Sequence, residues 1–125
     1  MPLVTESGKK HKLNVRMNRK READMSLNFI SPADVYEYTR HRPVLLIDIR
    51  DEAAYRRGHI PGAVNMPFGT FDLSSPRLSG YAAIVLCCDR GSASLTLGRR
   101  LARMGYRVLS VGGGMESYRG ILEKS

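Results

Sequence analysis

The distribution of hydrophobic and polar positions along the chain predicts alternating strands and helices. Two apolar runs, 44–47 and 82–88, show no alternation with polar residues, and 107–111 forms a third core strand. Continuous runs of this kind are typical of parallel strands covered on both faces. A brief strand is also predicted near 63–65, directly after a Pro-Gly turn signal.

Four helices are expected between and after these strands. Ser31 and Pro32 suit the N-cap and first position of a helix that runs to about Arg40. Gly58 and Gly105 are the expected ends of the next two helices. The helices cover 32–40, 51–57, 94–104 and 115–124, and the third carries an apolar stripe of Leu97, Leu101 and Met104. Strands separated by helices predict an α/β fold, with a mostly parallel sheet and helices on both faces.

Length and composition narrow the class of protein. The chain has 125 residues, 42% hydrophobic and 26% charged, as expected for one compact domain. No apolar run approaches the roughly 20 residues of a transmembrane helix, so no membrane partner is expected. The polar N-terminus predicts no secretory signal. Two adjacent cysteines in such a chain indicate reduced thiols, and therefore a cytoplasmic protein.

Positive charge is concentrated at the N-terminus. The net charge is +8, and residues 1–24 hold seven basic against three acidic side chains, which gives half of that total. We therefore divide the chain into a basic, disordered arm, 1–25, and one domain, 26–125. The arm is either a solvated tail or a contact for a polyanion such as RNA.

The segment 84–94, IVLCCDRGSAS, carries the candidate chemistry. Ligands of open α/β sheets bind beyond the carboxyl ends of the strands, where Cys87 and Cys88 fall. A loop of small residues can direct its N–H groups inward as an anion-binding nest, beside the positive end of the next helix. A thiol at its centre is expected to ionise more easily and to act as a nucleophile. The expected loop consists of Asp89, Arg90, Gly91, Ser92, Ala93 and Ser94.

From about 27 to 122, the sequence resembles rhodanese-like domains in their three signature blocks. These blocks are LLIDIRDEAAYRRGHIPGAVNMPF, IVLCCDRGSAS and GYRVLSVGGGMESYRG. The resemblance implies a single-domain thiosulfate sulfurtransferase with a central sheet of about five strands. It places the catalytic cysteine at Cys88 and the last strand residue at Cys87, which we expect to pack as a small hydrophobe. It also implies sulfur transfer through a Cys88 persulfide, from a small anionic donor to a thiol or protein acceptor, without metal or cofactor.

Several positions follow from the same resemblance. Many family members carry an arginine at the fifth position after the cysteine, where this chain has Ala93. Arg90 is then the candidate for attracting an anionic donor. Asp48 and Arg50 match an Asp-x-Arg element, which we interpret as a structural hydrogen-bonding pair near the site. His59 is interpreted as a structural histidine. The glycines 112–114 are expected to form a tight turn beside the loop.

Three alternatives compete with this interpretation. A cysteine phosphatase needs an arginine six residues after its cysteine, but Ser94 occupies that position after Cys88 and Ala93 after Cys87. A non-catalytic binding module is a second alternative, although the retained cysteine favours an enzyme. A third is a sulfur carrier to a protein or tRNA, with the basic arm docking the acceptor.

Overall fold

The computed structural model describes residues 26–125, so the predicted arm lies outside the described residues. The strands are β2 (Leu27–Ile30), β3 (Val44–Asp48), β4 (Val64–Asn65), β5 (Ala83–Cys87) and β6 (Val108–Val111). The helices are α3 (Val35–Arg40), α4 (Glu52–Arg57), α5 (Ser92–Arg103) and α6 (Gly114–Ser117). Two short 3-10 helices, η1 (Phe68–Thr70) and η2 (Pro76–Leu78), lie between β4 and β5.

The five strands form one parallel sheet in the order β2-β6-β5-β3-β4, which confirms the predicted α/β class. The chain leaves β3 toward β4 on one side and leaves β5 toward β6 on the other. The strand order therefore reverses between β3 and β5. In open α/β sheets such a reversal opens a crevice at the carboxyl ends of the two strands. Asp48 and Cys87, the last residues of β3 and β5, are paired there.

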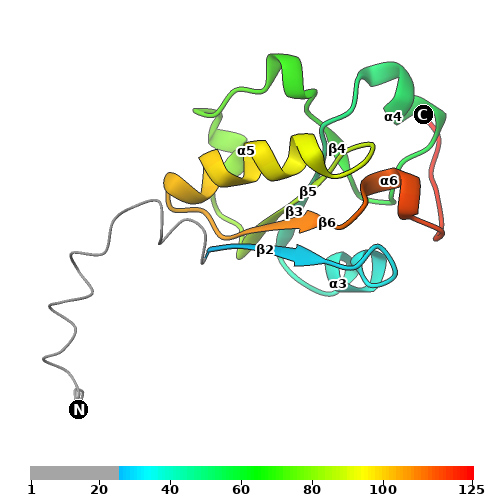
Figure 1. Ribbon diagram of the computed structural model, residues 1–125, viewed down its shortest axis with the longest axis horizontal. Helices are drawn as coiled ribbons and strands as arrows, with labels where there is room; N and C mark the ends of the chain where they lie inside the picture. The colour runs from blue at the N-terminus through cyan, green and yellow to red at the C-terminus, as the bar shows by residue number, and fades with distance from the viewer. Residues whose placement is uncertain (1–25) are drawn as a thin grey trace, which may run out of the picture.

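Both faces of the sheet are covered, with α5 on one face and α3 on the other (Figure 1). All five residues of β5 are buried, which explains its unbroken apolar run. Side chains alternate between the two faces of a strand. Accordingly, Leu86 and Cys88 pack with Leu97 of α5, whereas Val85 and Cys87 pack with Val35 of α3. The adjacent cysteines therefore belong to different halves of the core.

The first helix begins later than predicted, at Val35 instead of Pro32. The Ser31 hydroxyl accepts a hydrogen bond from the Ala33 N–H at 3.1 Å, and the Ser31 carbonyl accepts one from Asp34 at 2.9 Å. Ser31 therefore stabilises a separate turn, and the N-cap residue is Asp34, without a side-chain cap bond. Local side-chain bonding of this kind competes with the helix.

Two predicted helix ends also differ. Met104 follows the last residue of α5 and is 52% exposed, so it does not join the apolar stripe. The last helix contains only Gly114–Ser117 instead of extending to 124. Beyond it, Tyr118 donates to the carbonyl of Ile121, and Glu123 pairs its backbone with His59. These contacts tie the C-terminal residues to the α4 side of the molecule, which a longer helix would prevent.

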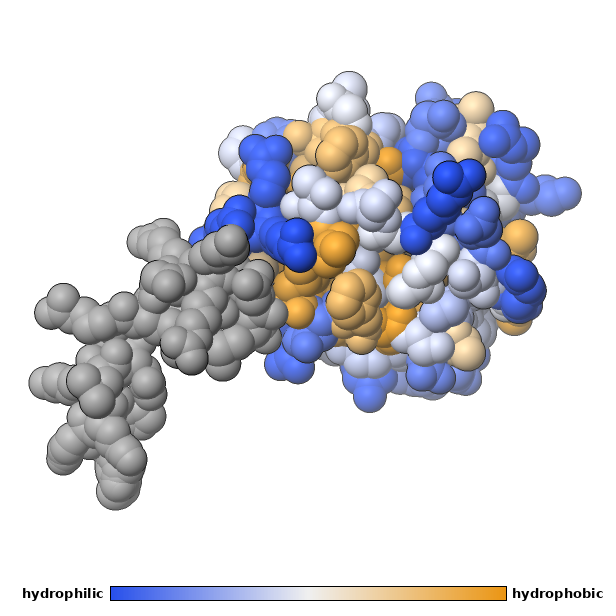
Figure 2. Space-filling view, in the orientation of Figure 1, coloured by the Kyte–Doolittle hydropathy of each residue, from blue (hydrophilic) through white to orange (hydrophobic). Residues whose placement is uncertain are grey.

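The edge strand β2 presents apolar surface, visible over that strand in Figure 2. Phe29 lies in β2 and is 64% exposed, whereas Leu27 of the same strand is buried.

No helix within residues 26–125 is long and apolar enough to cross a membrane.

Candidate active site

The candidate site lies in the crevice between the ends of β3 and β5. Cys88 directly follows β5, and Arg50 comes two residues after β3. The turn after β6 brings α6 to the same edge of the sheet, as predicted for the glycines 112–114. The pocket here has a volume of about 830 Å³ and is lined by Ile49, Arg50, Asp51, Cys88, Asp89, Arg90, Ser92, Ala93, Met115 and Glu116.

The loop after β5 curls around the sulfur of Cys88. The Sγ atom accepts hydrogen bonds from the backbone N–H groups of Gly91, at 3.1 Å, and Ser94, at 3.3 Å. Gly91 is the N-cap of α5 and has a φ of 103°, a conformation that glycine adopts without steric cost. The Ser94 N–H belongs to the first turn of α5, where backbone donors lack intrahelical partners. The Cys88 sulfur thus accepts a hydrogen bond from the first turn of α5, as the side chain of an N-cap residue does.

The remaining loop residues lie at the mouth of the pocket. Asp89, Arg90 and Ser92 are exposed, and Ala93 is half-buried. The Nε atom of Arg90 lies 3.6 Å from a carboxylate oxygen of Glu116, and both side chains are largely exposed. Such a solvated pair is weak. The Arg90 guanidinium therefore remains accessible to an anion that enters the pocket.

Helix α6 holds the cysteine loop from the other side. The N–H of Met115 donates to the carbonyl of Cys88 at 2.7 Å, and the N–H of Glu116 donates to that of Asp89 at 2.9 Å. Gly114 has a φ of 61°, and a Cβ atom there would collide with both of these carbonyls. The approach of α6 to the loop therefore requires glycine at this position.

Cys87 has a different environment from Cys88. It is 1% exposed, packs in the core on the α3 side and does not line the pocket. Within residues 26–125, its thiol has one hydrogen-bond contact, a long one of 3.8 Å to the carbonyl of Cys88. Burial, followed by the charge of Asp48, raises the pKa of the Cys87 thiol far above its ordinary value. Both effects disfavour the thiolate form of Cys87.

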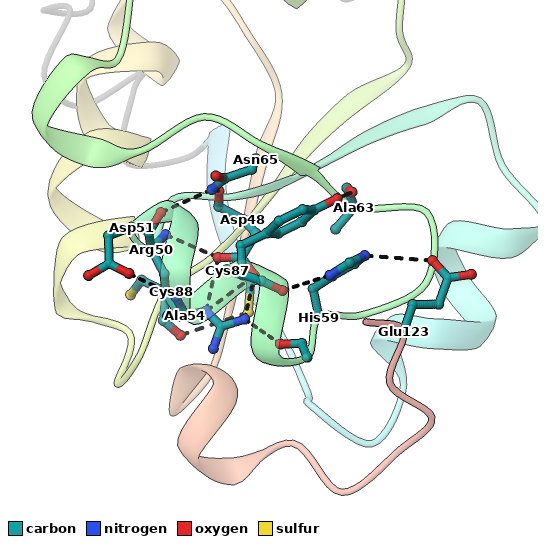
Figure 3. Close-up of polar contacts among 12 residues, drawn as sticks. Asp48, Arg50, Asp51, Ala54, His59, Ala63, Asn65, Cys87, Cys88 and Glu123 are labelled. Atoms are coloured by element: carbon teal, nitrogen blue, oxygen red, sulfur yellow. Dashed lines mark hydrogen bonds and ion pairs between the residues drawn. The ribbon is translucent and has the colours of Figure 1, made fainter. Parts of the chain in front are cut away.

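Asp48 and Arg50 form a buried ion pair beside the two cysteines (Figure 3). The Arg50 Nη2 atom donates to Asp48 at 2.7 Å and to the carbonyl of Gly58 at 2.7 Å, and Nε also donates to Asp48. Burial alone would lower the pKa of Arg50, but the hydrogen bonds and charge of Asp48 raise it overall. Asn65 donates to the carbonyls of Asp48 and Arg50, so β4 secures the end of β3.

His59 lies outside the pocket, between α4 and the C-terminal residues (Figure 3). Its ring stacks on Tyr55 at 3.8 Å, and its Nδ1–H donates to the Tyr55 carbonyl at 2.8 Å. Its Nε2 atom is 3.7 Å from a carboxylate oxygen of Glu123. The structure therefore does not bring His59 together with Cys88.

Sequence reasoning missed two contributors to the site. One is the N-terminus of α6, whose donors hold the loop carbonyls. The other is Ser110 in β6, whose hydroxyl lies 2.6 Å from that of Ser94. A serine inside the apolar run 108–111 was the available signal, because a buried polar residue needs a partner. Among residues 26–125, no three His, Cys, Asp or Glu side chains gather in a metal-binding arrangement.

Comparisons with known proteins point to one family. The chain is 35% identical over 81 residues to a tRNA sulfurtransferase of Desulfurococcus amylolyticus, a match that covers 65% of this chain but only 16% of that much longer protein. It is 24% identical over 91 residues to the thiosulfate sulfurtransferase GlpE of Coxiella burnetii, covering 72% of this chain and 85% of the relative.

A solved structure shows the same fold. The rhodanese-like domain of an Anabaena protein superposes with a TM-score of 0.65 at 22% identity, over 78% of this chain and 79% of that one. The profile of the rhodanese-like domain matches residues 31–120, which include both strands of the crevice, the cysteine loop and α6. The chain therefore belongs to the rhodanese-like domain family.

Proposed function

We propose that this protein is a sulfurtransferase that carries sulfane sulfur as a persulfide on Cys88. The observation that carries the proposal is the position of the Cys88 sulfur, which lines the pocket and accepts two backbone N–H bonds. Hydrogen bonds from N–H groups stabilise negative charge on sulfur. The relatives named for sulfur transfer support the same reaction class.

In the first half of the reaction, the Cys88 thiolate attacks the outer sulfur of a donor such as thiosulfate. A bond forms between Sγ and that sulfur, the sulfur–sulfur bond of the donor breaks, and sulfite leaves with the bonding electrons. In the second half, a thiolate or cyanide attacks the outer sulfur of the persulfide. The Cys88 thiolate then leaves, and the acceptor carries the sulfur away. Neither half needs a metal or an organic cofactor.

The loop supplies the binding groups for a small anionic donor. Of the six residues predicted to bind the donor, Asp89, Arg90, Ser92 and Ala93 line the pocket and are the proposed substrate-binding residues, whereas the N–H groups of Gly91 and Ser94 bond the Cys88 sulfur instead. The N–H groups of Ser92 and Ala93 have no hydrogen-bond acceptor among residues 26–125, and both residues line the pocket. Arg90 adds a positive charge at the mouth. Asp48 and Arg50 would keep the end of β3 in place, with His59 supporting the fold at a distance.

The acceptor is a thiol, a protein or a tRNA. The relationship to a tRNA sulfurtransferase and the net charge of +4 in residues 1–24 together favour a test with tRNA. Deletion of residues 1–24 should weaken tRNA binding and flatten its salt dependence, while Arg99→Gln with Arg100→Gln in α5 removes charge elsewhere as a control. Unchanged tRNA affinity after the deletion would exclude a docking role for the arm.

Both cysteines are free thiols, which supports a reducing compartment, and we place the protein in the cytoplasm. A persulfide carrier needs its cysteine reduced between turnovers. Cys87 is the natural internal control because it is equally reduced but lies on the other side of β5.

The decisive experiment is the intact mass of the protein after incubation with thiosulfate. Wild type and Cys87→Ser should gain one sulfur, about 32 Da, and lose it when cyanide is added, whereas Cys88→Ser should gain none. A gain that follows Cys87 would contradict the assignment of the nucleophile. No gain from thiosulfate or from a persulfide donor would instead favour a non-catalytic binding module.

A further inference from the structure

A pair of buried hydroxyl groups lies behind the Cys88 sulfur, on the side away from the pocket. Ser94 Oγ is 3.5 Å from Cys88 Sγ and 2.6 Å from Ser110 Oγ. Both serines are 0% exposed. Ser94 belongs to α5 and Ser110 to β6, so the pair exists only because the helix packs on that strand.

The hydrogen-bond inventory of this pair fixes which group donates to which. Each hydroxyl has one proton to donate and can accept two hydrogen bonds. Among residues 26–125, Ser110 Oγ has one partner, which is Ser94 Oγ. A buried hydroxyl that fails to donate is costly, so Ser110 donates to Ser94. The short distance of 2.6 Å fits a strong O–H···O bond.

The proton of Ser94 then has two possible acceptors, the Gly91 carbonyl at 3.1 Å and the Cys88 sulfur at 3.5 Å. The Gly91 carbonyl already accepts the N–H of Leu95 at 3.1 Å, so it does not depend on Ser94. With Cys88 as a neutral thiol, its S–H donates to Ser94 Oγ and the Ser94 proton faces Gly91. With Cys88 as a thiolate, the negative charge attracts the Ser94 proton to the sulfur.

We propose that the Ser94 hydroxyl changes its hydrogen-bond partner with the charge of Cys88, donating to the sulfur when Cys88 is a thiolate. Ser110 is a positioning residue that acts through Ser94. The pair stabilises the thiolate, both as the attacking group and as the group that leaves when sulfur passes to the acceptor. The inference rests on the proposed function only in taking Cys88 as the reacting group. It assigns a role to Ser110, which neither touches the pocket nor belongs to the cysteine loop.

The test is the rate at which iodoacetamide alkylates Cys88, followed across the pH range over which thiols titrate. Tandem mass spectrometry assigns the label to Cys88 rather than Cys87. For Ser94→Ala the midpoint of the rate profile should move to higher pH by about one unit, because a charge-assisted hydrogen bond is lost. Ser110→Ala should move it in the same direction by less. The double variant should match Ser94→Ala, since Ser110 acts only through Ser94.

Thr96→Val is the matched control, because Thr96 also lies in α5 and bonds a helix carbonyl, that of Ser92, but faces solvent. Its profile should coincide with that of wild type. The proposal is overturned if Ser94→Ala leaves the midpoint unchanged, if the two serine effects add, or if Thr96→Val shifts the profile equally. Thermal unfolding of each variant shows that it is folded. Alkylation requires no sulfur donor, so a failure to form the persulfide would refute the proposed function without altering this result.

Discussion

Gly114→Ala provides a direct test of the contact between α6 and the cysteine loop. The substitution places a methyl group against the carbonyls of Cys88 and Asp89, at a backbone φ of 61°. An L-residue in this left-handed region costs about 1–2 kcal/mol. If α6 moves away to relieve the collision, the hydrogen bonds from Met115 and Glu116 are lost, at about 0.5–1.5 kcal/mol each. The free energy of unfolding should therefore fall by about 3 kcal/mol.

Gly62→Ala is the control for this test, because it introduces the backbone strain of a left-handed position without a collision. Gly62 has a φ of 88°, and a Cβ atom there would meet no other atom within 4 Å. Both substitutions restrict the unfolded chain equally, so that contribution cancels in the comparison. Gly114→Ala should unfold about 2 kcal/mol more easily than Gly62→Ala, a difference of roughly 10 °C in melting temperature for a domain of this size.

The loop should respond as well as the fold. With its two carbonyls released, the loop no longer holds its N–H groups on the sulfur, and sulfur loading of Cys88 from thiosulfate should slow by at least about tenfold. Urea unfolding and the rate of mass gain measure the two effects. Equal stability of the two glycine variants, together with a wild-type loading rate in Gly114→Ala, would refute the claim that α6 positions the loop.

Three further predictions follow from the charges and the burial around the site. Asp48→Asn removes the counter-ion of the part-buried Arg50 guanidinium and should cost about 1.5–3 kcal/mol in urea unfolding, as expected for hydrogen bonds between charged groups. A loss below about 1 kcal/mol would show that the pair is dispensable. Because burial raises the pKa of Cys87, iodoacetamide at neutral pH should label only Cys88 in the native protein and both cysteines after unfolding; native labelling of Cys87 would contradict its assigned environment. Arg90→Gln should raise the KM for thiosulfate several-fold at low salt with little change in kcat, and high salt should remove this effect. The control Arg103→Gln, on an exposed residue of α5 outside the pocket, should change neither constant.

The cysteine loop was largely predictable because its determinants are local. The small residues after Cys88, the glycine at 91 and the following helix all lie within one short segment of the sequence. Backbone N–H groups at the start of a helix have no partners of their own, so a thiol placed there by the strand end meets them. Consecutive residues of a strand point to opposite faces, so the two cysteines were expected to face different ways, and the family resemblance placed Cys88 in the loop.

The ends of the helices were less predictable from the pattern of residues. Ser31 and Pro32 suit a helix start, yet the bonds made by the Ser31 side chain and carbonyl form a turn there. The residues after Ser117 suit a helix, but the pairing of Glu123 with His59 draws them away. In both cases contacts outside the periodic pattern determine where the helix begins or ends.

The sequence by itself determined the α/β class, the covered parallel strands and the position of a thiol at a strand end, because these depend on the residue pattern within single elements. Only the tertiary structure decided the strand order, the crevice between β3 and β5, the hydrogen bonds from α6 to the cysteine loop and the hydrogen bond between Ser94 and Ser110. These features join segments far apart in the chain, and the packing of helices on the sheet, rather than any local preference, brings them together.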